Sequence, residues 1–182
     1  MNLIVAMVVI GIILLWFIIT YNMFIRLKNS LNEAFSTMDV YLKKRWDLIP
    51  NLVETVKGYV EHEKSTFEKV VELRNTAYSN LPSDKKIALN AQLSTGLAKL
   101  LAVAENYPDL KANQNFMDLS GQLSQIESDI ANSRKYYNAV VKEYNNAVQT
   151  IPSNIVAAIC QFKPAKMFEI DEFQRENVQV KF

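Results

Sequence analysis

The longest uninterrupted apolar segment of the chain lies at its N-terminus. Residues 1–25 contain no Asp, Glu, Lys, Arg or His, and the chain from Leu3 to Ile19 is apolar apart from Gly11. A helix needs about 20 apolar residues to cross roughly 30 Å of hydrocarbon, so this segment is long enough to span a membrane. We therefore expect a transmembrane anchor over residues 1–25, with an apolar surface formed by side chains such as Leu3, Ile10, Leu14, Trp16 and Ile19.

A cleaved secretory signal peptide is the alternative interpretation of this segment. Such a peptide has a basic start, an apolar stretch of about 7 to 15 residues and a small-x-small cleavage site. Here the first basic residue is Arg26 and the apolar stretch is longer, so a retained anchor is favoured. Basic residues collect on the cytoplasmic flank of a membrane helix. We therefore expect a single-pass protein of the inner or plasma membrane, with its N-terminus outside and its helical domain in the cytoplasm.

After the anchor, apolar residues recur at intervals of three and four residues, which is the pattern of packed helices. The clearest run predicts a helix from about 110 to 150, with one apolar face formed by Phe116, Leu119, Leu123, Ile126, Ile130, Tyr137, Val140, Tyr144 and Ala147. Residues 85–104 repeat the pattern in a shorter helix, which we expect to pack antiparallel to its neighbours through short connections. Loops are predicted where Pro interrupts the pattern, at 80–84, 105–109 and 150–154.

Pro50 is the difficult point in the first half of the body. Proline is tolerated in the first turn of a helix but costs about 3 kcal/mol in its interior, which would allow an antiparallel hairpin here. One seven-residue register nevertheless runs from Leu31 to Ala77 without a break at the proline. We therefore favour a continuous helix, kinked at Pro50, that extends the membrane helix to about residue 80.

Together these patterns predict an all-α protein. Its N-terminal transmembrane helix continues into a long antiparallel helical bundle of three long helices, the first kinked at Pro50. An up-and-down four-helix bundle is the alternative. The expected domains are the anchor (1–25), the helical bundle (26–160) and a C-terminal tail (161–182) that is extended or partly disordered.

Charge and motif content argue against several functions. Twenty basic and 19 acidic residues leave a net charge of +1, which gives no electrostatic support for a nucleic-acid partner. The one histidine, His62, lies between Glu61 and Glu63, and adjacent helical positions point about 100° apart, so the three cannot converge on a metal ion. The chain has no Gly-rich phosphate loop and no Gly-x-Ser-x-Gly motif. We therefore expect no enzymatic activity, no cofactor and no metal.

Basic residues that follow the anchor are candidates for contact with anionic lipid headgroups, where each adds about 1 kcal/mol. These candidates are Arg26, Lys28, Lys43 and Lys44. Distance weakens the case for the later pair, because Lys43 lies roughly 25 Å beyond Ile25 on a straight helix. The alternative for residues 43–45 is a solvated helix face, with Arg45 paired to Asp47 or Asp39.

Two longer motifs carry polar residues that helix packing alone does not require. The first is DLIPNLVETVKGY at residues 47–59, and the second is AVAENYPDLK at residues 102–111. With these motifs the chain closely resembles the bacterial LemA family, over nearly its whole length through Phe162. The resemblance implies a single-pass, N-out membrane protein with a helical cytoplasmic body and without an established enzymatic activity. The family includes proteins of magnetosome membranes, which suggests by analogy a role in organising or shaping membranes.

We hypothesise that the two motifs make contacts between subunits, because loops with distinctive chemistry more often serve function than packing. The candidate interaction residues are Arg45, Asp47, Pro50, Asn51, Glu105, Asn106, Tyr107, Pro108 and Asp109. On this hypothesis the chain is a membrane-anchored helical scaffold that contacts membrane lipid, forms a homo-oligomer and organises or remodels the bacterial membrane. The alternative is a membrane-tethered adaptor or sensor that recruits a cytoplasmic protein partner.

Overall fold

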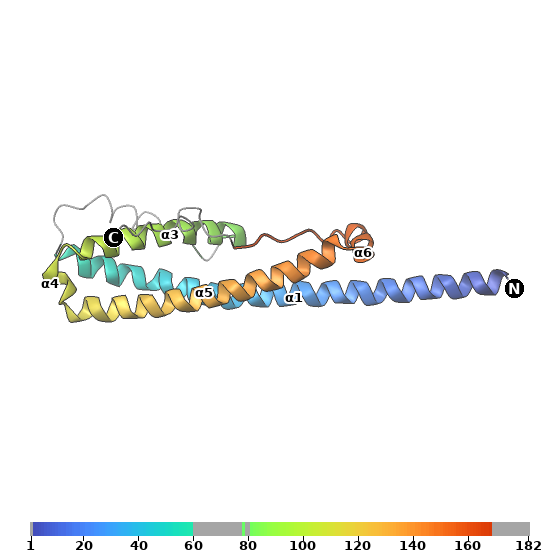
Figure 1. Ribbon diagram of the computed structural model, residues 1–182, viewed down its shortest axis with the longest axis horizontal. Helices are drawn as coiled ribbons and strands as arrows, with labels where there is room; N and C mark the ends of the chain where they lie inside the picture. Colours follow the sequence, from blue (N-terminus) through green and yellow to red (C-terminus); the bar gives the residue numbers. More distant parts are fainter. Residues whose placement is uncertain (1, 60–77, 79–80, 169–182) are drawn as a thin grey trace, which may run out of the picture. The chain divides into compact units, whose positions relative to one another are not determined.

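The computed structural model describes residues 2–59, 78 and 81–168, most of which lie in α-helices (Figure 1). The helices are α1 (Asn2–Lys57), α3 (Ser83–Ala104), α4 (Pro108–Lys111), α5 (Gln114–Gln149) and α6 (Ser153–Ile159). No strand occurs among the residues just given, and the long apolar helix at the N-terminus leads into a helical body. The all-α fold class predicted from the sequence is confirmed.

The chain divides into two compact units, each of which contains a part of α1 and a part of α5. The anchor unit comprises Met1–Thr37 and Arg134–Met167. The bundle unit comprises Met38–Ser133 and Phe168–Phe182.

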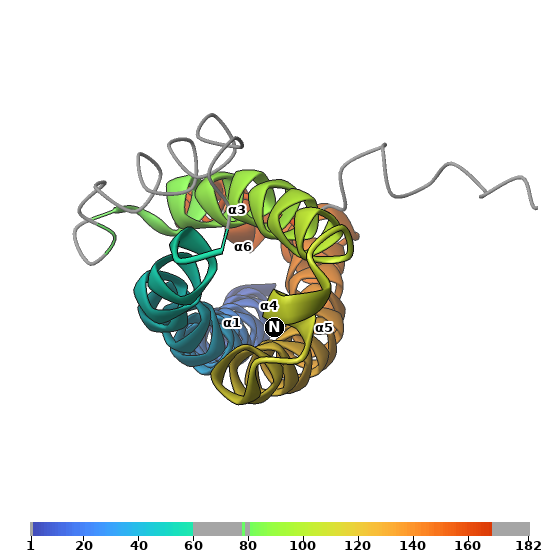
Figure 2. The same ribbon diagram turned by 90° about the vertical axis from the view of Figure 1, so that its left-hand side faces the viewer.

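In the bundle unit, segments of α1, α3 and α5 surround an aliphatic core (Figure 2). Buried side chains recur at three- and four-residue intervals, as the sequence pattern predicts for amphipathic helices. They include Met38, Leu42, Ile49, Leu52 and Val56 on α1, Leu93, Leu97, Leu100 and Ala104 on α3, and Phe116, Leu123 and Ile130 on α5. Each fully buried Leu or Ile contributes about 1.5–3 kcal/mol relative to exposure, so this core holds the unit together.

Polar contacts in the bundle unit show in which direction each helix runs. Asp39 of α1 pairs with Lys86 of α3, and six residues further along α1 Arg45 contacts Asn90 and Ser94. The residue numbers of the contacting positions increase in the same direction along both helices, so α3 runs parallel to α1. The expectation that α3 packs antiparallel to all its neighbours is therefore wrong for α1. This direction is the one expected from the alternative four-helix up-and-down bundle.

The direction of α5 is the reverse. Arg45 of α1 contacts Glu127, whereas Tyr59, beyond the end of α1, accepts a hydrogen bond from Asn113, just before α5. The residue number therefore falls along α5 as it rises along α1. α5 runs antiparallel to α1, and hence also to α3.

Helix α1 continues through Pro50, as predicted. It ends at Lys57, however, and Gly58 and Tyr59 form a turn, so the predicted extension to about residue 80 is wrong. The chain has reversed direction by Tyr78, whose hydroxyl donates a 2.7 Å hydrogen bond to Asp39. Glycine favours helix termination, which accounts for the end of α1. The part of the seven-residue register beyond this point, through Ala77, and the group formed by Glu61, His62 and Glu63 lie outside the described residues.

In the anchor unit, α1 packs against the C-terminal half of α5 and against α6. Phe24 of α1 is fully buried and stacks on Phe162 with ring centroids 4.8 Å apart. It also makes an edge-to-face contact with Tyr144, with ring centroids 6.5 Å apart. Val156 and Ala157 of α6 complete this buried cluster. The sequence pattern predicts the turn at 150–154 but not the helix that follows it.

The chain beyond α6 is held against α5 without helical structure of its own. The side-chain amide of Asn145 donates to the carbonyl of Ala165 at 2.9 Å and accepts from the amide of Ala165 at 2.8 Å. The Tyr137 hydroxyl donates to the carbonyl of Lys166 at 3.0 Å. These backbone contacts fix the start of the predicted tail along the helix.

Candidate functional site

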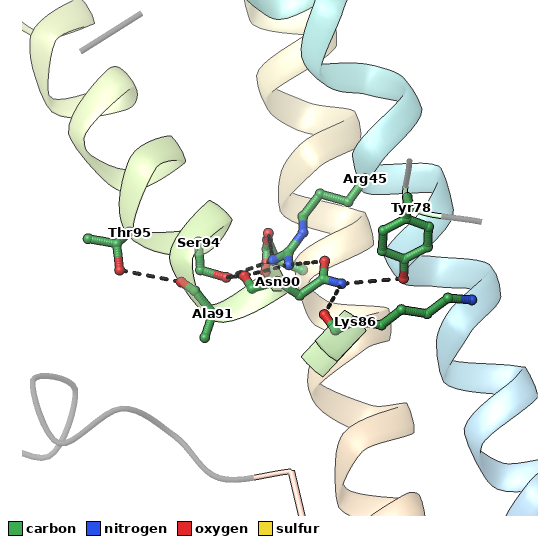
Figure 3. A network of polar contacts seen from close by, with 8 residues as sticks. Arg45, Tyr78, Lys86, Asn90, Ala91, Ser94 and Thr95 are labelled. Atoms are coloured by element: carbon green, nitrogen blue, oxygen red, sulfur yellow. Dashed lines mark hydrogen bonds and ion pairs between the residues drawn. The ribbon is translucent and has the colours of Figure 1, made fainter. Parts of the chain in front are cut away.

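Arg45 is the centre of a buried polar cluster in the bundle unit (Figure 3). It lies on α1 between Leu42 and Ile49, at the position where the apolar spacing of three and four residues demands a core side chain, and it is 1% exposed. One guanidinium nitrogen, Nη1, donates to Ser94 Oγ and to Glu127 Oε1, both at 2.8 Å. The Arg45 side chain therefore joins α1 to both α3 and α5.

The second guanidinium nitrogen of Arg45 is bound by a single residue of α3. Nη2 donates to the backbone carbonyl of Asn90 at 3.0 Å and to its side-chain oxygen at 2.7 Å. The remaining nitrogen, Nε, is buried and has no hydrogen-bond partner. Four hydrogen bonds thus fix the guanidinium in one orientation, which favours one register between the helices.

A second part of the cluster surrounds Tyr78. Its hydroxyl donates to Asp39 Oδ1 at 2.7 Å and accepts from the amide of Asn90 at 3.3 Å, which connects it to the Arg45 part. Lys86 Nζ donates to the other Asp39 oxygen at 2.6 Å and lies 4.9 Å from the centre of the Tyr78 ring. The indole of Trp46 packs on the same ring, with centroids 5.1 Å apart.

The charges of this cluster balance. Arg45 and Lys86 are opposed by Glu127 and Asp39, so the buried guanidinium does not stand alone. Burial, and next the hydrogen bond to Asp39, raises the pKa of Tyr78 well above its ordinary value. The phenol therefore stays protonated and serves as a donor in the folded protein.

The geometry of the cluster is that of a structural clamp. Its polar groups are turned toward one another, and its strongest hydrogen bonds join α1 to α3 and α5. Within the part of the chain that the structure describes, no three His, Cys, Asp or Glu side chains gather as a metal site would require. A buried ion pair is weak evidence for stability, but it is well suited to fixing which helical register forms.

The structure separates the members of the first predicted interaction motif. Arg45 is buried, so it does not belong to a solvated face, and its acidic partner is Glu127 rather than Asp47 or Asp39. Asp47 is exposed and pairs with Lys43 one turn earlier on α1. Pro50 is half-buried and Asn51 is exposed.

The second predicted motif lies on the surface at the α3–α4 turn. Glu105, Asn106, Pro108 and Asp109 are exposed, whereas Tyr107 is half-buried. Glu105 pairs with Lys111 across the turn, and Pro108 opens the short helix α4. The following Leu110 is fully buried and fixes the turn to the core.

The candidate headgroup ligands are all exposed on α1, with Arg26 and Lys28 in the anchor unit and Lys43 and Lys44 in the bundle unit. In the bundle unit, Lys43 is engaged by Asp47, and Lys44 Nζ lies 5.3 Å from the centre of the Tyr41 ring. Only Arg26 and Lys28 directly follow the apolar segment of α1.

The anchor residues predicted from composition lie on the N-terminal part of α1, and most of them are exposed. Leu3, Ile10, Leu14 and Ile19 expose between 56% and 74% of their surface, whereas Trp16 is half-buried against the Phe24 cluster. In the described part of the chain, the single stretch long and apolar enough to cross a membrane is in α1, near the N-terminus. An exposed apolar surface of this size marks a site of contact with lipid or with another protein.

Together, the apolar N-terminal helix and the helical body define a class: a membrane-associated, all-helical protein. Within this class, the chain belongs to the LemA family, whose family model matches residues 34–182. The resemblance inferred from the motifs at residues 47–59 and 102–111 is thereby confirmed.

Individual relatives agree with this assignment. The chain is 26% identical over 159 residues to Protein LemA of Metamycoplasma hominis, covering 86% of this chain and 72% of that protein. It is 26% identical over 175 residues to Magnetosome protein MamQ 2 of Paramagnetospirillum magneticum, and 24% identical over 174 residues to Magnetosome protein MamQ of Magnetospirillum gryphiswaldense. These two matches cover 82% and 81% of this chain, but only 64% of each magnetosome protein.

Proposed function

We propose that this protein is a membrane-anchored helical scaffold that self-associates and organises or remodels the bacterial membrane. In this proposal it crosses the inner or plasma membrane once, with its N-terminus outside and its helical body in the cytoplasm. It acts through protein and lipid contacts and has no catalytic activity. The observation that carries the proposal is the exposed apolar surface of α1 from Leu3 to Leu15, on the same helix that enters the bundle unit.

The bundle unit has the properties expected of a scaffold. Four hydrogen bonds from Arg45 tie three helices in one register, and the α3–α4 turn is held by buried Leu110. The polar side chains of Asn106 and Asp109 therefore lie on a surface of defined shape. A fixed surface of this kind supports specific contacts with a second subunit, because little conformational entropy is lost on association.

The relatives support a role at membranes. Two of them carry the name magnetosome protein, and a magnetosome is a membrane-bounded structure. The chain spans less than two thirds of those proteins, so the likeness does not extend over their full length. From these relatives we extend to this chain only a role in organising membranes, carried out by the part that it shares with them.

Crosslinking of the full-length protein in its native membrane tests self-association. The test variant, Asp47→Arg with Asp109→Arg, reverses one exposed charge in each motif. A matched control, Glu54→Arg with Asp118→Arg, reverses two exposed acidic side chains that are not among the candidate interaction residues. Glu54 is a close match because it pairs with Lys57, as Asp47 pairs with Lys43. Arginine adds no amine that an amine-reactive crosslinker would modify.

We expect crosslinked homo-oligomers in the wild type and the control, and a several-fold loss of them in the test variant. Crosslinking that is equal in the test variant and the control would overturn the role of the motifs. A wild-type protein that crosslinks to one different protein, and not to itself, would instead establish the adaptor alternative.

Protease accessibility tests the proposed orientation. In sealed inside-out membrane vesicles, added trypsin should degrade the helical body, whereas in right-side-out cells stripped of their wall the body should be protected. The opposite pattern would place the helical body outside the cell and overturn the proposed topology.

A further inference from the structure

Two uncharged segments of the anchor unit pack against each other. Residues 1–25 carry no charge, and neither do residues 144–162, between Glu143 and Lys163. The structure joins them in one apolar cluster, made of buried Phe24, Tyr144, Val156 and Ala157 with Trp16, Phe17 and Phe162 packed against it. Each segment is followed by exposed basic side chains, Arg26 and Lys28 on α1 and Lys163 and Lys166 in the tail.

Helix α6 is apolar on both of its sides. Val156 and Ala157 face the cluster and are 0% and 2% exposed. On the outward side, Ile155 and Ile159 lie one turn apart and are 53% and 64% exposed, and Ile151, just before the helix, is 84% exposed. A helix in water presents charged or polar side chains to the solvent, so this outward face requires another explanation.

The depth at which α1 would lie in the bilayer places α6 at the membrane boundary, which explains its apolar outward face. About 20 helical residues cross the hydrocarbon core, so a span that begins at Leu3 reaches about Asn22. Trp16 and Phe17 then lie within the hydrocarbon, roughly 8 Å from its boundary. Both side chains pack against the cluster to which α6 contributes. If α1 spans the membrane, α6 therefore lies at the same boundary.

The backbone groups at the ends of α6 have hydrogen-bond partners within the protein. In the hydrocarbon and at its edge, polar backbone groups must find partners within the protein. In the first turn of α6 the amides of Asn154 and Ile155 donate to the carbonyls of Thr150 and Pro152 at 2.9 and 3.2 Å, and after the helix the amide of Phe162 donates to the carbonyl of Ala157 at 2.9 Å. The ends of α6 are thus closed by hydrogen bonds within the anchor unit.

We propose that α6 is a second membrane contact, an interfacial helix that inserts into the leaflet where α1 emerges toward Arg26. Ile151, Ile155 and Ile159 enter the acyl chains, and Lys163 and Lys166 lie at the level of the phosphates, together with Arg26 and Lys28. Short helices with one face in the acyl region and basic residues at the headgroups bind in this manner. The proposal rests on the membrane anchor of the proposed function. It adds that α6 displaces lipid in one leaflet only and so acts as a wedge.

Depth-dependent fluorescence quenching of the full-length protein tests this contact. In a Cys160→Ser background, single cysteines replace Ile155 or Ile159 and carry an environment-sensitive dye. Ile10 provides a matched position within the membrane segment, and Ala139, exposed on α5 of the same unit, provides one outside it. The proteins are reconstituted in vesicles of phosphatidylethanolamine and phosphatidylglycerol, and quenched by doxyl-labelled lipid or by aqueous iodide.

Doxyl lipid should reduce the emission of dyes at Ile155 and Ile159 several-fold more than that of a dye at Ala139, with a blue-shifted emission. Quenching by iodide equal to that at Ala139 would overturn the interfacial helix. Protection from both quenchers would also overturn it, because a second copy of the chain would then cover the face. Loss of lipid quenching at Ile10 itself would instead refute the anchor, so the two failures are distinguishable.

Discussion

The Arg45–Glu127 ion pair permits a quantitative test of the clamp in the bundle unit. The two charges are unequally buried, because the side chain of Arg45 is 2% exposed and that of Glu127 is 42% exposed. Glu127→Gln keeps a hydrogen-bond acceptor but leaves a buried guanidinium that cannot lose its proton. Breaking a buried pair in this way costs about 3–5 kcal/mol, and partial solvation of Glu127 places the expected cost at the lower limit, about 3 kcal/mol.

The partner substitution, Arg45→Met, removes the charge and retains an unbranched side chain. The Glu127 carboxylate is then solvated by water. Asn90 Oδ1 loses its donor, and leaving this buried acceptor without a hydrogen bond costs about 2 kcal/mol. In the Arg45→Met background, Glu127 has no guanidinium to neutralise, so Glu127→Gln should cost less than about 0.5 kcal/mol. The coupling free energy between the two residues is therefore expected to be about 2.5 kcal/mol.

Urea unfolding of the full-length protein in mild detergent measures this coupling. Trp46 reports on the cluster because its ring packs on Tyr78, and a Trp16→Phe background removes the other tryptophan. The four proteins of the double-mutant cycle are compared at the same detergent concentration. If Glu127→Gln costs the same in both backgrounds, the two charges do not interact and the clamp is refuted.

Three further changes test other parts of the molecule. Because the pKa of Tyr78 is raised in the folded state, the folded protein holds a proton that the unfolded chain releases above about pH 10, and stability should fall as the pH rises further. Tyr78→Phe should make that fall less steep and cost about 1 kcal/mol at neutral pH, and an unchanged slope of the urea midpoint against pH would contradict this. Pro50→Ala restores a backbone donor inside α1 and should raise the free energy of unfolding by about 1 kcal/mol or more, whereas a decrease would show that the bundle requires the proline. Asn145→Ala removes two hydrogen bonds to the tail and should speed tryptic cleavage after Lys166 several-fold. Asn146→Ala, at an exposed neighbouring position, serves as its control, and equal rates would refute the tether.

Helix α5 shows how far the apolar pattern predicts the fold. Its buried positions follow the predicted seam from Phe116 to Tyr144, because apolar side chains repeat there over many turns with a single polar substitute, Ser133. The helix begins at Gln114 rather than near 110 because Pro108 opens the separate helix α4. The side chain of Asn113 then accepts a hydrogen bond from the amide of Phe116 and caps α5.

The end of α1 shows where the same pattern fails. An apolar register continues whenever successive helices pack on one core, so it does not distinguish a continuing helix from a chain that has turned back. Gly58 was the local signal for the end, and the long-range contact of Tyr78 with Asp39 is what establishes the reversal. Contacts of this kind depend on tertiary structure and leave no mark in a short window of sequence.

Two parts of the candidate sites were not recognised from the sequence. Arg45 looks like the third member of an exposed basic run, yet its spacing from Leu42 and Ile49 places it on the core face. That spacing could have identified it. Helix α6 spans only Ser153–Ile159, which is too short for a helical period to stand out. The uncharged stretch from 144 to 162 was the available signal, and its meaning depends on the packing against α1.

We propose that the protein self-associates through a membrane-anchored helical body. The most direct measurement is the protein mass of the full-length chain in mild detergent, by light scattering corrected for bound detergent, with electron microscopy of the same sample. We predict a uniform particle of several times the 20.8 kDa protomer mass. A monodisperse particle of one 20.8 kDa chain, alone or with one different protein, would contradict the scaffold.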